Sequence, residues 1–115
     1  MILQTFVKIN AYYDIICGCS ILNILPLNHM RIFHIDMFKQ NNSSRDRILG
    51  YFIIFYGIIR TTNYYDIIYL SYILEASYFI NELTHSTVYF NKSIFVIISC
   101  FIIATQLYNY AFNEF

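Results

Sequence analysis

Five polar side chains lie along one apolar stretch of the chain at helical spacing. Ser71, Glu75, Tyr78, Glu82 and His85 are separated by four, three, four and three residues, which places all five on one face of a helix. A carboxyl group held away from water titrates outside its usual range and can bind a proton or a ligand. One interpretation of the stripe is therefore a ligand or proton site centred on Glu75.

A second interpretation gives these groups a structural role. An unpaired charge in an apolar span costs at least about 2.5 kcal/mol, so such groups face protein or water. A protonated Glu75, or an ion pair between Arg60 and Glu82, would join helices by hydrogen bonds. Gly50 and Gly57 would let two helices approach closely. The sequence favours this interpretation. The alternative ligand or proton site would consist of Asp14, Glu75, Tyr78 and His85.

Catalytic motifs are scarce in this chain. Glu82 and His85 form a Glu-x-x-His element, which di-metal helical bundles use twice, but it occurs once here. No Ser, Cys or Thr has a His base nearby in the pattern, and three glycines in total leave no phosphate-binding loop or dinucleotide fingerprint. The sequence predicts a protein that is not an enzyme and binds no metal or cofactor.

Composition places the polar residues in a membrane protein. The 115 residues are 58% hydrophobic and only 12% charged, whereas an ordinary soluble domain is about 25% charged. The net charge is zero, which excludes nucleic-acid binding by phosphate attraction. Cys17, Cys19 and Cys100 all fall in apolar stretches, so we expect them to be small packing residues rather than a disulfide framework.

Four apolar stretches predict the helices that position these groups: 7–25, 48–61, 65–83 and 93–112. Three of them approach the 20 or so residues that a spanning helix needs. The second is short, and it spans only if Arg45, Arg47 and Arg60 extend from its ends or the membrane thins. We predict an all-α integral membrane bundle of four transmembrane helices in a single domain. Pro26 closes the first helix and opens a loop at 26–47.

Two other predicted helices carry polar edges that could face the same interior as the stripe. The first helix offers Asn10, Asp14 and Gly18 at a spacing of four. The fourth offers Lys92, Ser99, Gln106 and Asn113 at a spacing of seven. Both spacings return a residue to the same side of a helix, so we expect these edges to turn inward.

The middle of the chain contains two sequence motifs that resemble those of a known protein family. Arg47-Ile-Leu-Gly50 is followed, ten residues after the glycine, by Arg60, and the next apolar stretch ends with Phe79-Ile-Asn-Glu82. Across about residues 45–82, this pattern resembles the small four-span endoplasmic-reticulum scaffold proteins of sterol C-4 demethylation. The resemblance implies a non-catalytic tether that holds sterol-modifying enzymes together in that membrane.

The resemblance also implies roles for individual residues. Structural or docking positions would be Arg47, Gly50, Arg60 and Glu82. Tyr78 stands where the family commonly has a histidine, and Glu75 replaces an apolar residue. A small-molecule or proton-binding membrane bundle centred on Glu75 is therefore the alternative function. Expected partners are membrane lipids and other membrane proteins, with association between copies of the chain left open.

Overall fold

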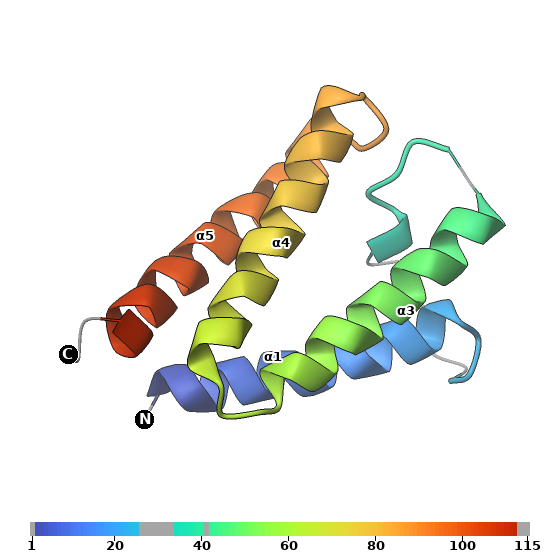
Figure 1. The fold of residues 1–115 in the computed structure, drawn as a ribbon. Coiled ribbons are helices and arrows are strands. Elements are labelled where there is room, and N and C mark those ends of the chain that lie inside the picture. The colour runs from blue at the N-terminus through green and yellow to red at the C-terminus, as the bar shows by residue number, and fades with distance from the viewer. Residues whose placement is uncertain (1, 26–33, 41, 113–115) are drawn as a thin grey trace. The chain divides into compact units, whose positions relative to one another are not determined.

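Four long helices make up the fold in the computed structural model, which describes residues 2–25, 34–40 and 42–112. They are α1 (Ile2–Ile21), α3 (Ser43–Arg60), α4 (Tyr65–Thr84) and α5 (Phe90–Phe112) (Figure 1). The described ranges contain no β-strand, so the all-α prediction is confirmed. The chain divides into two compact units, Met1–Thr61 and Thr62–Phe115, and each unit is a pair of neighbouring helices.

The first unit pairs α1 with α3, which lie side by side (Figure 1). Asn42 begins α3 because its side chain accepts a hydrogen bond from the backbone N–H of Arg45 at 3.1 Å, as N-cap residues do. The helix therefore starts at Ser43, inside the predicted loop, and its 18 residues extend about 27 Å. The predicted helix over 48–61 was too short because its polar first turn lies outside the apolar stretch.

α1 ends in a Schellman motif. After Ile21 the chain turns at Asn23, whose φ of 62° lies in the left-handed region. The N–H of Ile24 donates to the carbonyl of Cys19 at 2.9 Å, and the N–H of Asn23 donates to the carbonyl of Ser20 at 3.1 Å. These two bonds satisfy carbonyl groups that the last helical turn would otherwise leave open.

This ending corrects the predicted first helix. The sequence predicted 7–25 with Pro26 as the terminator, whereas the helix runs from Ile2 to Ile21. Asn23 has already closed it, since asparagine tolerates the left-handed conformation better than other residues with a Cβ. Pro26 and the rest of 26–33 lie outside the described residues.

Asn23 gives a local test of this helix end. We expect Asn23→Val to lower the free energy of unfolding by about 1–2 kcal/mol, because a β-branched residue is strained at positive φ. Asn23→Gly should cost nothing measurable, since glycine adopts this conformation freely. Thermal or denaturant unfolding in mild detergent measures both variants. Equal stability of the two variants would contradict the assigned helix end.

The second unit pairs α4 with α5 (Figure 1). Predicted and observed bounds agree for α4 within one residue, and α5 begins three residues before its predicted start. The buried face of α5 consists of Ser93, Ile97, Cys100, Ala104 and Leu107. Their spacing of four, three, four and three is that of one helix face. This face packs on α4, so the two helices meet through small and aliphatic side chains.

One helix has the composition of a membrane span. Among the helices that the structure describes, only α5 contains a segment long and apolar enough to cross a bilayer, the 21 residues Phe90–Tyr110. The other three contain 18 to 20 residues but carry more polar or charged groups, among them Lys8 and Asp14 in α1 and Glu75 in α4. Four membrane crossings stay a prediction.

Candidate functional site

A buried ion pair joins the two helices of the first unit. Nη1 of Arg60, at the end of α3, donates to Oδ2 of Asp14 in α1 at 2.7 Å. The two side chains are only 1% and 6% exposed. The guanidinium carbon of Arg60 also lies 4.2 Å from the ring centroid of Tyr56, a cation–π geometry. The sequence suggested Glu82 as the partner of Arg60, and the structure assigns Asp14 instead.

Glycines let α1 and α3 approach closely enough to form this pair. The chain has three glycines, and all of them lie on the contact between these helices. A Cβ on Gly18 would lie 2.5 Å from Cγ1 of Ile54 and 2.8 Å from the carbonyl oxygen of Gly50. A Cβ on Gly57 would lie 3.1 Å from the carbonyl oxygen of Ala11. Backbone thus packs against backbone, as in the small-residue interfaces of membrane helices.

Two cations lie at the C-terminal end of α3. Nζ of Lys8 donates to the carbonyl of Thr61 at 3.0 Å, and Arg60 occupies the last turn of the helix. The C-terminus of a helix carries partial negative charge, which favours cations there. Because Lys8 lies early in α1 and Thr61 follows α3, while Gly18 meets Gly50, the two helices run antiparallel.

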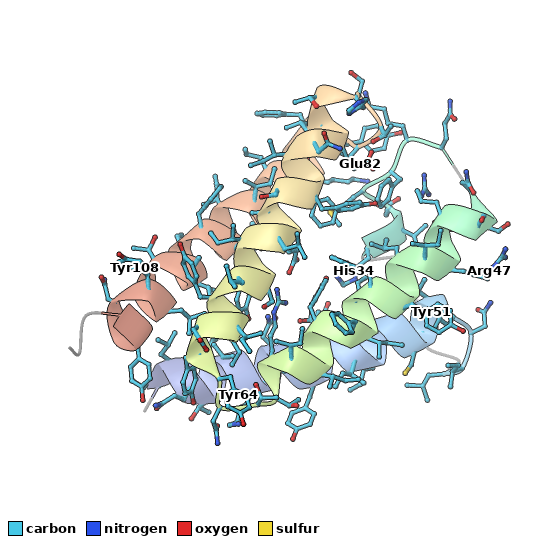
Figure 2. The ribbon with its side chains drawn as sticks, in the orientation of Figure 1. His34, Arg47, Tyr51, Tyr64, Glu82 and Tyr108 are labelled. Carbon is cyan, nitrogen blue, oxygen red and sulfur yellow. The ribbon has the colours of Figure 1, made fainter. Side chains whose placement is uncertain are left out.

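The far end of the predicted polar stripe forms a helix cap. The N–H of Ser86 donates to the carbonyl of Leu83, and the N–H of Thr87 to that of Glu82, both at 3.1 Å. Ser86 has a φ of 58°, so this is a second Schellman motif. The hydroxyl of Thr87 donates to the Glu82 carboxylate. Nδ1 of His85 lies 2.8 Å from the carbonyl of Asn81. Glu82 (Figure 2) and His85 therefore make hydrogen bonds that close the C-terminal end of α4, and the position of His85 follows from its contact with Asn81.

The other half of the stripe lies on α4 itself. Ser71 and Glu75 are buried, whereas Tyr78 is half-buried. The hydroxyl of Ser71 donates to the carbonyl of Ile68 at 2.6 Å, and the ring of Tyr78 packs edge-on against Phe79 with centroids 5.1 Å apart. The stripe thus divides into Glu82 and His85 at the end of α4 and Ser71, Glu75 and Tyr78 along its body. Glu75 keeps a buried position near the middle of α4.

Arg47 and most of the described polar edge of α5 are exposed, whereas the sequence predicted a structural role for Arg47 and an inward-facing edge. Arg47 lies exposed on α3 (Figure 2), so its predicted structural role has no support in the contact between α1 and α3. Lys92 and Gln106 are exposed, and the half-buried Ser99 donates its hydroxyl hydrogen to the carbonyl of Phe95 in its own helix. This edge lies on the side of α5 away from its buried face. The fourth residue of the edge, Asn113, lies outside the described residues.

A groove in the second unit offers little chemistry. This groove of about 370 Å³ is lined by Tyr69, Ile73, Phe101, Ala104, Thr105 and Tyr108. The tyrosines are its only ionisable groups. Within the described ranges, no three His, Cys, Asp or Glu side chains come together as a metal site would require. The structure thus presents helix-to-helix contacts as its principal polar features.

Comparisons with known proteins add no relative to the helix-to-helix contacts described above. No protein-family model, curated protein or solved structure matches the chain. The resemblance in the Arg47–Gly50 and Phe79–Glu82 motifs accordingly stays a prediction.

Proposed function

We propose that the chain is a non-catalytic, multi-span membrane protein that acts as a scaffold for other membrane proteins. The observation that carries this proposal is the combination, in the first unit, of a buried ion pair with an outer surface of large apolar side chains. The ion pair between Asp14 and Arg60 is buried, while large apolar side chains lie exposed. On α1 and α3 the exposed side chains include Ile2, Phe6, Ile9, Ile48, Tyr51, Phe55 and Ile58.

The spacing of the exposed side chains supports a lipid-facing surface. Ile48, Tyr51, Phe55 and Ile58 follow one another at three, four and three residues and so form one row along α3. Tyr51 is 66% exposed and points away from the helix (Figure 2). Soluble monomers rarely expose a continuous apolar row of this length. Lipid would be the natural contact for this row.

The second unit also exposes large apolar side chains. Leu70 and Leu74 on α4, and Phe95, Ile98 and Ile102 on α5, are 52% to 67% exposed. Hydrocarbon is as favourable an environment as a protein core for such side chains, so a bilayer removes the cost of exposing them. These outer faces could dock lipids or the helices of other membrane proteins.

A scaffold fits the polar groups better than a transporter or an enzyme does. Asp14 and Arg60 neutralise each other between two helices, and Glu82 and His85 cap a helix end. Polar groups that are held in such contacts fix the positions of the helices, as a scaffold requires. We further propose sterol-modifying enzymes in the endoplasmic-reticulum membrane as the partners. The support for this class of partner is the motif resemblance that includes Gly50 and Arg60.

Extraction and co-purification test the proposal in two separable steps. The full chain should remain in the membrane pellet after alkaline carbonate washing and dissolve only in detergent. Release by carbonate would contradict the membrane assignment. Purification from mild detergent should then recover sterol-modifying enzymes. A chain that stays in the membrane but purifies without them would contradict the tether alone.

A ligand or proton site at Glu75 is the second candidate, and the burial of this carboxyl near the middle of α4 favours it. We expect Glu75→Gln to leave the recovery of partners unchanged if the protein is a scaffold, because the amide keeps the shape of the side chain. Asp66→Asn, which changes an exposed carboxylate on the same helix, is the matched control. Loss of a pH-dependent binding or transport activity in Glu75→Gln alone would instead favour the second candidate.

A further inference from the structure

α5 has a polar seam on the side opposite its contact with α4. Its residues are Lys92, Phe95, Ser99, Ile102, Gln106 and Asn109. The spacing alternates between three and four residues, which is the a and d pattern of a helix that packs along a second helix. Five of the six side chains are exposed, with Phe95 at 67% and Ile102 at 55%.

Gln106 is the residue in this seam that most needs a partner. It is exposed, and within the part of the chain that the structure describes its side-chain amide makes no hydrogen bond. The 23 residues of α5 are centred on Phe101, so Gln106 lies about 7.5 Å from the midpoint of the helix. The hydrocarbon core extends about 15 Å to each side of the bilayer centre. In a centred span, Gln106 would thus face hydrocarbon with its amide unsatisfied, which is unfavourable.

Other polar residues near the seam are already satisfied. The hydroxyl of Ser99 donates to the carbonyl of Phe95, and that of Thr105 to the carbonyl of Phe101, both at 2.8 Å. Hydroxyl groups can use their own helix in this way. The longer amide of Gln106 makes no such bond, so it is the group that calls for a contact from outside the unit.

We propose that this seam is where two copies of the chain associate in the membrane, with Gln106 of each copy bonded to Gln106 of the other. A primary amide carries both donors and acceptors, so two glutamines related by a two-fold axis satisfy each other. The interface of a two-fold dimer uses the same surface on both copies. Phe95 and Ile102 supply the apolar layers of the seam, and a hydrogen-bonded polar layer at Gln106 would fix the register of such a pair. The inference rests on the proposed membrane location.

Energy transfer between labelled copies in vesicles tests this dimer. Full-length chains that carry donor or acceptor dyes are reconstituted together in phosphatidylcholine vesicles at increasing dilution in lipid. We expect transfer above the random level for the unaltered chain. Gln106→Leu should weaken dimerisation by about threefold to thirtyfold, the range for hydrogen bonds between membrane helices. Gln106→Asn, which keeps the amide, should retain part of the affinity.

Thr105→Val is the matched control, because it removes a neighbouring exposed hydroxyl that is satisfied within α5. It should leave energy transfer unchanged. Random transfer for the unaltered chain, or undiminished transfer in Gln106→Leu, would overturn the dimer. If Gln106→Leu loses stability while the unaltered chain shows random transfer, another segment of the same chain occupies the seam, and the dimer is equally overturned.

Flotation of the same vesicles separates this inference from the proposed function. A chain that floats with the vesicles but shows random transfer contradicts only the dimer. A chain that fails to float contradicts both the membrane location and the dimer that depends on it.

Discussion

Arg60→Leu and Asp14→Leu should each lower the free energy of unfolding by about 3–5 kcal/mol, because each leaves a buried charge without its partner. The two side chains are 1% and 6% exposed and are joined at 2.7 Å. Neither charge can therefore turn to water while α1 and α3 stay paired. Denaturant titration of the full chain in mild detergent, followed by the loss of helix signal, measures the change.

The double variant Asp14→Leu/Arg60→Leu distinguishes a paired charge from a general packing loss. Replacing both partners of a buried ion pair with apolar residues is often neutral or stabilising, so the double variant should recover most of the stability that either single variant loses. A coupling free energy near zero in this double-mutant cycle would contradict the ion pair. Arg47→Leu, an exposed arginine on the same helix, is the control and should change stability by less than about 0.5 kcal/mol.

Gly18→Ala should cost about 1–3 kcal/mol of stability, the usual range for overpacking a closely fitted contact. The new methyl group would lie 2.8 Å from the carbonyl oxygen of Gly50 and 3.2 Å from the backbone nitrogen of Ile54. Backbone atoms cannot rotate away as the end of a side chain can, so α1 and α3 must separate. Alanine is about 1 kcal/mol more favourable than glycine inside a helix, which makes any net loss a direct sign of steric conflict.

Gly50→Ala provides the matched control on the same contact. The nearest atoms to its new methyl group belong to the side chains of Leu22 and Ile21, at 3.0 to 3.1 Å, and these can shift by a few tenths of an ångström. We expect Gly50→Ala to be close to neutral, since the gain in helix propensity offsets the crowding. Denaturant titration of both variants measures the difference. If Gly18→Ala proved as stable as Gly50→Ala, the close approach of the two helices would be wrong.

Sequence periodicity and composition predicted the helices well where apolar stretches end at polar turns. α4 begins at Tyr65, directly after the polar Thr61–Asn63 turn, and its predicted end is within one residue of Thr84. The C-terminal end of α1 and the start of α3 were missed for a local reason. Asn23 ends α1 through its left-handed conformation, and Asn42 begins α3 through a side-chain cap. Both signals depend on single asparagines in a chain that has many of them.

The sequence predicted which residues belong to the candidate site, but not how they pair. The sequence identified Asp14, Arg60, Gly50 and Gly57 as polar or small residues on apolar helices, but it could not pair them. Asp14 and Arg60 are 46 residues apart, and no local rule links two groups at that distance. For Glu82, helical spacing indicated an inward stripe, whereas hydrogen bonds at the C-terminus of α4 use it in a cap. The spacing of residues along a helix predicts which side chains share a face, but it does not predict which groups that face contacts.

The Asp14–Arg60 pair also constrains how the protein can be made. Ribosomes extend a chain by roughly 5–20 residues per second, so the 46 residues between the two charges delay the arginine by about 2–9 s after the aspartate. Throughout that interval α1 exists without the Arg60 guanidinium that pairs with Asp14 in the folded unit. If the first unit enters the bilayer, α1 would wait in an aqueous or chaperoned setting until α3 has been synthesised. The two helices would then insert together as one hairpin in which the charges of Asp14 and Arg60 are paired.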